Sequence, residues 1–321
     1  MDPLNVNDAT LARPSKFWEK LAAYHTEELS KAGVERMKRH QALHYFTWRW
    51  GFAPRNKQLQ FLLTHTSPIS WIRAAAEPMD LSDTAWHDVS WSRSERWLYT
   101  VMIRLLWNYA RRHDRINAAS LAEPTLGDPL PTYTHGRLIS QDVANSVLEV
   151  SAMARALSGR RPRSILEVGA GYGRTAYVLL NVFPESHYTI VDIEPALSIS
   201  RWYLSSLFPA DRLTFLSPDA LGSLPVGAVD LALSISSLQE MTPAQVEGYL
   251  SLFDRVGSPG TVYLKQWHRW HNAEDNVTLP FADYPIPQRW QRIFRHRAPV
   301  QTNFEEGAWA LPALPRAAGV N

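Results

Sequence analysis

Residues 164–175, SILEVGAGYGRT, constrain the fold of this chain more than any other stretch. An apolar run at Ile165, Leu166 and Val168 leads directly into glycines at alternate positions, and a helix-forming run begins at Thr175. A buried strand, a glycine turn and a helix N-terminus in this order predict a βα unit that cradles a nucleotide-type cofactor. We therefore expect an α/β protein built around a mostly parallel sheet.

The spacing of the glycines indicates which cofactor the turn binds. Dinucleotide turns follow G-x-G-x-x-G, whereas Gly169, Gly171 and Gly173 follow G-x-G-x-G, and Arg174 stands where the last dinucleotide glycine would be. Glu167 precedes the turn, and its carboxylate suits the sulfonium and ammonium groups of S-adenosylmethionine (SAM). The carboxylate of SAM suits a helix N-terminus. SAM is the predicted cofactor, with S-adenosylhomocysteine as its product, and a NAD-dependent dehydrogenase is disfavoured.

Strand and helix patterns alternate after residue 140, which predicts a Rossmann-like sheet with helices on both faces. Asp192 ends the second strand about twenty residues after the turn, where a carboxylate accepts the ribose hydroxyls. Asp219 follows the third strand and is the candidate partner of the adenine amino group. Strands are expected at 164–168, 187–192, 213–216, 229–235 and 261–266, with two final strands near 292–297 and 304–311.

The predicted cofactor contacts come from three places: the glycine turn, the ends of the next two strands, and the segment after the fourth strand. They are Glu167, Gly169, Ala170, Gly171, Tyr172, Gly173, Arg174, Asp192, Ile193, Asp219, Ala220, Ser236, Ser237 and Leu238.

Residues 1–130 are predicted to form a helical accessory domain, and residues 131–321 the SAM-binding domain. Apolar side chains recur at helical spacing over about 15–50 and 92–113, and Leu121–Gly136 is rich in Pro and Gly, as expected of a linker. The aromatic helices could cover the cofactor domain as a lid or form a homodimer interface. His40 and His44 have the spacing of metal ligands, but no third ligand is near them, so no metal site is predicted.

Composition excludes several classes of function. The formal net charge is +2 with 20% charged residues, so the chain lacks the excess of basic residues that is typical of nucleic-acid-binding proteins. No cysteine is present, so disulfides, thiolate zinc sites and cysteine nucleophiles are excluded. No apolar run approaches the length of a membrane span, and no signal peptide is evident. We expect a cytoplasmic protein with a small-molecule partner and no nucleic acid or membrane partner.

Several blocks together resemble one enzyme family. ILEVGAGYGRTAYVLL, IVDIEPALSISRWYLS, ISSLQEMTPAQVEGYL and YLKQW, with HGRLISQD before them and YPIPQRWQRIF after them, are similar to the sugar O-methyltransferase family of class I SAM-dependent enzymes. The resemblance covers roughly residues 133–309. It implies a class I methyltransferase sheet, a role in natural-product biosynthesis, and cofactor contacts at Glu167, Gly169, Gly171, Asp192 and Asp219. It implies no catalytic residue.

Methyl transfer to a hydroxyl needs a group that accepts the hydroxyl proton, or a metal ion that acidifies it. Glu240 after the fourth strand, His268 after the fifth and His135 before the first are the candidate catalytic residues, because each could approach the carboxyl edge of the sheet. A metal-assisted variant would draw on Asp275, Asp283 and Glu240, although no motif groups them.

Two other functions stay open at this point. The acceptor could be a carboxylate or an amine, and a basic pocket containing Lys265, Arg269 and Arg289 would indicate a carboxylate. The chain could also bind SAM without transferring a methyl group, as a regulatory or scaffolding module.

Overall fold

The computed structural model describes residues 11, 13–39, 57–87 and 89–314. The chain first forms α2 (Lys16–Ala32), whose N-cap Ser15 accepts a hydrogen bond from the Trp18 amide. Gly33, at φ +76°, ends this helix, and the short 3₁₀ turn η1 (Val34–Arg36) follows. The expected continuation of helix toward residue 50 is therefore broken at Gly33, and His40 and His44 lie outside the described residues.

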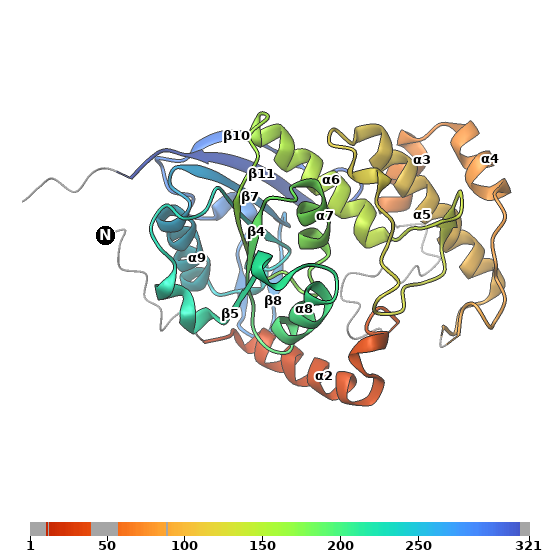
Figure 1. Ribbon diagram of the computed structural model, residues 1–321, viewed down its shortest axis with the longest axis horizontal. Coiled ribbons are helices and arrows are strands. Elements are labelled where there is room, and N and C mark those ends of the chain that lie inside the picture. The colour runs from red at the N-terminus through yellow and green to blue at the C-terminus, as the bar shows by residue number, and fades with distance from the viewer. Residues whose placement is uncertain (1–10, 12, 40–56, 88, 315–321) are drawn as a thin grey trace, which may run out of the picture.

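Three further helices pack together at the right of Figure 1: α3 (Lys57–His65), α4 (Pro68–Ala76) and α5 (Arg93–His113). A capping box of Ser92 and Glu95 starts α5. Buried Arg104 of α5 donates hydrogen bonds to the carbonyls of Ala74, Glu77 and Pro78. These bonds satisfy carbonyls at and beyond the C-terminus of α4, and so hold α4 against α5.

One seven-stranded sheet organises the rest of the chain, in the order β10-β11-β7-β6-β3-β4-β5. The five strands from β5 to β7 are parallel, and β11 and β10 are added antiparallel. The strand bounds are β3 (Ser164–Val168), β4 (His187–Val191), β5 (Leu213–Leu216), β6 (Leu231–Ile235), β7 (Gly260–Trp267), β10 (Gln291–Arg297) and β11 (Phe304–Leu311).

Both faces of the sheet are covered, so the strands carry apolar residues on both sides. Ile165 of β3 packs into the core shared with α5, α6, α7 and α8, and its neighbour Leu166 packs into the core shared with α9. The bounds of these helices are α6 (Gln141–Leu157), α7 (Arg174–Val182), α8 (Ala196–Ser205) and α9 (Pro243–Val256). The predicted Rossmann-like α/β class is confirmed, as are the seven strands.

Short elements complete the structure. Two hairpins, β1–β2 and β8–β9, were not expected from the sequence. Their bounds are β1 (Tyr133–Thr134), β2 (Arg137–Leu138), β8 (His271–Asn272) and β9 (Val277–Thr278), and the remaining 3₁₀ turns are η2 (Ala118–Ser120), η3 (Ala210–Arg212), η4 (Pro218–Ser223), η5 (Leu238–Glu240) and η6 (Phe281–Asp283). No helix of the described residues is long and apolar enough to cross a membrane.

Candidate active site

The glycine turn lies at the carboxyl end of β3, between β4 on one side and β6 on the other. This is the point where the strand order reverses, and open α/β sheets bind their ligands there. Gly169, Gly171 and Gly173 have φ values of +76°, +58° and +95°. Only glycine adopts such a run of left-handed residues without steric cost, which explains the composition of the turn.

Two of these glycines are also required by close packing. A Cβ added at Gly169 would lie 2.1 Å from Ser237 Oγ and 2.3 Å from Ser237 Cβ. A Cβ added at Gly173 would lie 2.8 Å from Cδ1 of Leu204 in α8. Gly169 therefore lets the turn after β3 touch the turn after β6, and Gly173 lets α7 start close to α8.

Asp192 follows β4 directly and faces the glycine turn. Its carboxylate accepts hydrogen bonds from the amides of Gly171 at 3.0 Å and Ile193 at 2.8 Å. Burial raises the pKa of Asp192 to about 7, against the lowering effect of these backbone hydrogen bonds. The carboxylate has capacity for further donors, as a group that accepts ribose hydroxyls requires.

A cavity opens between the glycine turn and Asp192, and part of its wall comes from the N-terminus of the chain. Residues 13–18, which we call the N-terminal strap, pass along this cavity. Trp18, Pro14 and Ser15 of the strap face it together with Gly169, Asp192 and Ser237. The other lining residues are Leu11, Arg13, Val168, Val191, Ile193, Pro218, Met241, Gln245 and Tyr249.

Side-chain to backbone hydrogen bonds hold the strap in place. Ser15 Oγ donates to the Glu240 carbonyl at 2.9 Å, and Gln245 Nε2 donates to the Arg13 carbonyl at 2.6 Å. The carboxylate of Asp275 accepts from the amides of Lys16 and Phe17, each at 3.2 Å. The start of α2 is thus fixed to the carboxyl edge of the sheet, away from α3–α5 (Figure 1).

The ISSLQEM and YLKQW blocks interlock through two glutamines. The Gln266 side chain accepts from the Ser237 amide at 3.2 Å and donates to the Ser234 carbonyl at 3.0 Å. The Gln239 side chain accepts from the Trp267 amide at 2.7 Å and donates to Ser236 Oγ at 3.0 Å. Sequence reasoning missed both glutamines as positioning residues, although both lie in the quoted blocks. Together they fix the turn that touches Gly169.

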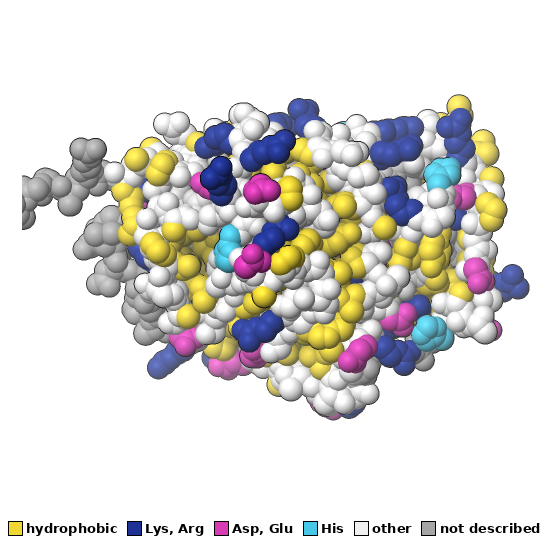
Figure 2. All heavy atoms as spheres, viewed as in Figure 1, with side chains coloured by type: hydrophobic (Ala, Val, Ile, Leu, Met, Phe, Trp, Pro, Cys, Tyr) yellow, Lys and Arg dark blue, Asp and Glu magenta, His cyan; other side chains and the backbone are white. Residues whose placement is uncertain are grey.

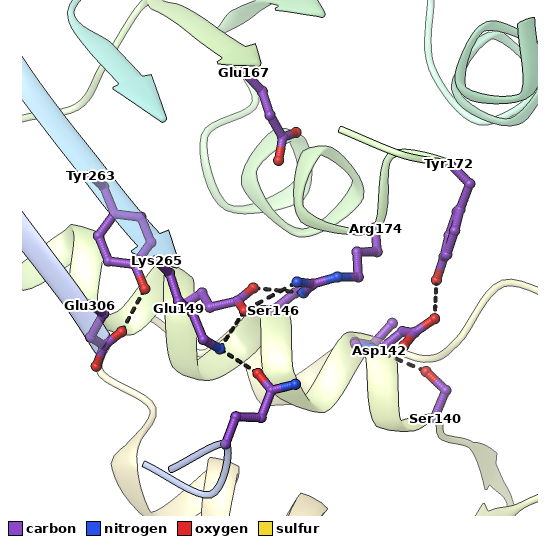
Figure 3. Close-up of polar contacts among 12 residues, drawn as sticks. Ser140, Asp142, Ser146, Glu149, Glu167, Tyr172, Arg174, Tyr263, Lys265 and Glu306 are labelled. Atoms are coloured by element: carbon purple, nitrogen blue, oxygen red, sulfur yellow. Dashed lines mark hydrogen bonds and ion pairs between the residues drawn. The ribbon is translucent and has the colours of Figure 1, made fainter. Parts of the chain in front are cut away.

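A buried ionic network lies beneath the turn (Figure 3). Arg174 donates to both carboxylate oxygens of Glu149 in α6, at 2.6 and 3.1 Å, and to Ser146 Oγ at 2.8 Å. Lys265 of β7 also donates to Glu149, at 2.7 Å, and to Gln301 at 2.5 Å. The guanidinium of Arg174 therefore faces α6 and not the cavity, so that any contact between Arg174 and a cofactor would come from its backbone.

Glu167 and Tyr172 also turn toward the interior. Tyr188 of β4 donates to the carboxylate of Glu167 at 2.7 Å, and burial raises the pKa of Glu167 to about 7. The Tyr172 hydroxyl donates to Asp142 in the first turn of α6, at 2.7 Å. Glu167 thus supports the turn from below, in a site that favours its protonated form.

The other predicted cofactor residues fall into two groups. Ile193 and Ser237 line the cavity, as do Gly169 and Asp192. Asp219 is exposed in η4 and does not line the cavity, although the preceding Pro218 does. Ala170, Ser236 and Leu238 are buried and Ala220 is half-buried, and none of these four lines the cavity.

The three candidate catalytic residues do not meet. Glu240 is fully buried between the cavity-lining residues Ser237 and Met241 in the chain. His268 pairs through Nδ1 with Glu305 at 2.9 Å, and its side chain is 43% exposed. His135 is exposed in the β1–β2 hairpin, where its amide donates to Glu77. Of the three, only Glu240 is adjacent in the chain to a residue that lines the cavity.

The carboxylates of the metal-assisted variant have structural partners or lie apart. Asp275 holds the start of α2 and accepts from Asn272 Nδ2 at 2.9 Å, and Asp283 lies in η6. Within the described part of the chain, no group of three or more His, Asp or Glu side chains is placed to hold a metal ion.

Comparison with known proteins gives a short match in sequence and partial alignments in structure. No protein-family model matches the chain. A segment of 69 residues is 35% identical to the release factor glutamine methyltransferase of Rhodopirellula baltica, and the match spans 21% of this chain and 23% of that protein. The chain therefore spans about a quarter of the length of this curated relative.

Two solved structures each align with about half of this chain. The PH0226 protein of Pyrococcus horikoshii aligns over 54% of this chain and 92% of its own, with 13% identity and a TM-score of 0.43. The Burkholderia thailandensis 1,6-didemethyltoxoflavin-N1-methyltransferase, solved with 1,6-didemethyltoxoflavin and S-adenosylhomocysteine bound, aligns over 50% of this chain and 76% of its own, with 16% identity and a TM-score of 0.40.

The chain has the class I fold of SAM-dependent methyltransferases. The order of its sheet, its glycine turn and the acidic residue after β4 carry this conclusion.

Proposed function

We propose that this protein is a SAM-dependent O-methyltransferase that acts on a hydroxyl group of a sugar or of a glycosylated small molecule, in natural-product biosynthesis. The observation that carries the proposal is the cavity between the left-handed glycine turn and Asp192 at the switch point of the sheet. The choice of a sugar hydroxyl is supported by the resemblance of the ISSLQEM and YLKQW blocks, which form one hydrogen-bonded unit beside that cavity.

The residues present fit SAM as a ligand. Asp192 offers a buried carboxylate to ribose hydroxyls, and the amides at the start of α7 suit the cofactor carboxylate. Trp18 and Ile193 offer apolar surface on the wall of the same cavity. When bound, SAM supplies a methyl group whose transfer to oxygen leaves neutral S-adenosylhomocysteine.

The strap brings residues 13–18 to the proposed cofactor site, which is otherwise built by the sheet and the turns after its strands. Ser15 reaches the Glu240 carbonyl across 225 residues of sequence, and Trp18 follows it on the cavity wall. The role of residues 13–18 is therefore that of a lid segment over the cofactor, which shields the reacting groups from water.

The protein must also take up the proton of the acceptor hydroxyl. Glu240 is our candidate for this base, because it lies in the turn after β6 at the edge where the methyl group is expected. His268 and His135 are weaker candidates, since the first is paired with Glu305 and the second belongs to an exposed hairpin.

The three basic residues expected for a carboxylate acceptor do not form a pocket at the cavity. Arg269 is exposed and does not line the cavity, and the other two have partners within the protein. Lys265 is bound to Glu149 and Gln301, and Arg289 donates to the carboxylate of Asp254 at 2.9 Å. Neither cation is available to a substrate carboxylate without breaking an existing ion pair.

The experiment is a methyl-transfer assay with purified protein, SAM and a panel of sugar-bearing small molecules, read by mass spectrometry. A mass increase of one methyl group on a hydroxyl-bearing acceptor supports the proposal, and the Asp192→Ala variant serves as a control deficient in cofactor binding. SAM binding without transfer to any panel member would favour a binding module, and transfer to a carboxylate or amine would refute the hydroxyl assignment.

The base is tested separately. Glu240→Gln should lower kcat by about 100-fold or more while the affinity for SAM changes little, since loss of a general base affects the chemical step. His268→Ala is the matched comparison and should retain most of the activity. Near-full turnover in Glu240→Gln with SAM still bound would exclude Glu240 as the base.

A further inference from the structure

A second hollow lies at the amino edge of the sheet, opposite to the glycine turn. Four arginines line it: Arg115, Arg155, Arg160 and Arg161. Arg115 follows α5, Arg155 lies in the last turn of α6, and the other two belong to the loop that enters β3. All four are exposed, and no acidic residue is among the described residues that line the hollow.

Two of these arginines are held in place by the protein. Arg160 Nη2 donates to Thr261 Oγ1 at 3.0 Å, and Arg155 donates to His296 Nε2 at 3.0 Å. The Arg155 guanidinium also stacks over the Phe294 ring, 4.0 Å from its centre. These contacts orient the cations without neutralising them, because no partner is a carboxylate.

The other two cations have no such contacts. Among the described residues, neither Arg115 nor Arg161 has a side-chain hydrogen bond or an ion pair. The whole chain carries a formal net charge of only +2, so four cations around one hollow are a strong local excess. Like charges that line the same hollow repel one another, and an anion bound among them relieves this repulsion. Figure 2 shows Lys and Arg side chains gathered along the upper edge of the molecule, above the label of α6 in Figure 1.

The remainder of the lining indicates the shape of the ligand. Ile116, Ala154, Val182 and Phe183 contribute apolar surface, and Ser158 and Gly159 lie beside the arginines. Guanidinium groups match phosphate oxygens in charge and in fork geometry. A ligand that combines a phosphate group with a compact apolar body would use both parts of the lining.

We propose that this arginine hollow is a binding site for a phosphorylated small molecule, separate from the methyl-transfer site. The apolar side chains in the lining favour such a ligand over the extended backbone of a nucleic acid, which needs a groove or stripe of cations. The proposal does not depend on the proposed function, because the hollow shares no lining residue with the cofactor cavity.

The test uses phenyl phosphate and inorganic phosphate as probes, in titration calorimetry with the full chain at low salt. Phenyl phosphate should bind more tightly than inorganic phosphate, because only the former offers an apolar ring to the apolar lining residues. Arg115→Glu combined with Arg161→Glu should weaken phenyl phosphate binding at least about tenfold, since two charge-assisted contacts become repulsive. Arg93→Glu, an exposed charge reversal at the start of α5, is the matched control and should bind as the wild type does.

Three results would overturn the proposal. They are no detectable binding of phenyl phosphate by the wild type at millimolar concentration, an equal loss of affinity in Arg93→Glu, and tight binding of a thymidine oligonucleotide without binding of phenyl phosphate. The urea unfolding midpoint should be the same in the double variant as in the wild type, which shows that the fold is intact. If the double variant does not fold, the Gln substitutions at the same two positions replace it.

Discussion

The contact between Gly169 and Ser237 allows a sharp test of how the cofactor turn is built. In Gly169→Ala the new Cβ would lie 2.1 Å from Ser237 Oγ and 2.3 Å from Ser237 Cβ, with φ at +76°. A left-handed non-glycine residue costs about 1–2 kcal/mol. Overpacking adds about 1–3 kcal/mol. We therefore expect Gly169→Ala to lower the free energy of unfolding by about 2–5 kcal/mol.

The two contributions can be separated with a second substitution. Gly169→Ala combined with Ser237→Gly removes both atoms that the new Cβ would meet, so only the backbone strain should remain. The pair should show a coupling energy of about 1–3 kcal/mol. Gly169→Ala combined with Ser237→Ala is the matched control, because the Cβ at 237 stays 2.3 Å from the new methyl group.

The assay is urea unfolding followed by tryptophan fluorescence, with SAM affinity measured by calorimetry on each variant that folds. Stability and SAM affinity should recover together when Ser237→Gly is added to Gly169→Ala, because the same turn forms the cofactor cavity. Neither should recover when Ser237→Ala is added. A coupling energy below about 0.5 kcal/mol between Gly169→Ala and Ser237→Gly would refute the packing argument. So would an equal recovery of stability with Ser237→Gly and with Ser237→Ala.

Three further perturbations test the site. Glu149→Gln should lower the free energy of unfolding in urea by about 3–5 kcal/mol, because Arg174 and Lys265 would lose a buried counter-ion. A decrease below about 1 kcal/mol would show that the network is solvated. Asp192→Asn should weaken SAM binding about 10–100-fold by calorimetry, through weaker hydrogen bonds to an uncharged acceptor, and unchanged affinity would remove Asp192 from the cofactor site. Burial raises the pKa of Glu167 from 4.5 to about 7, so the folded state binds the extra proton and the free energy of unfolding should fall as pH rises from about 4.5 to 7. Glu167→Gln should remove that carboxyl's share of the fall, and an unchanged pH profile would contradict the raised pKa.

Local patterns in the sequence determined the sheet and much of the cofactor turn. The bounds of β3 and β5 agree with the prediction residue for residue. An apolar run between turn residues is a local pattern, so such a strand can be predicted from its own segment of sequence. Ser140 caps α6 through a hydrogen bond from the Val143 amide, in keeping with the preference of serine for the N-cap position. The placement of Asp192 beside the turn likewise follows from parallel strand order, since neighbouring strands end at the same edge.

Contacts between distant segments could be decided only by the tertiary structure. Ser15 and Glu240 lie 225 residues apart, and no local pattern indicates that the strap crosses the carboxyl edge of the sheet. The sequence suggested a lid for the N-terminal helices as a whole, whereas the structure places only the strap residues Arg13, Pro14, Ser15 and Trp18, with Leu11, on the cavity wall. The division at residue 130 stays a prediction, as does the homodimer.

The sequence also could not predict the direction in which a charged side chain points. Arg174 follows the glycine turn and was expected at the cofactor, but its guanidinium is bound to Glu149 in the interior. Glycines at set positions allow positive φ values there, so the backbone conformation of the turn can be predicted from the sequence. A long side chain can reach either face, and the position of a counter-ion 25 residues away in the chain decides which one it takes.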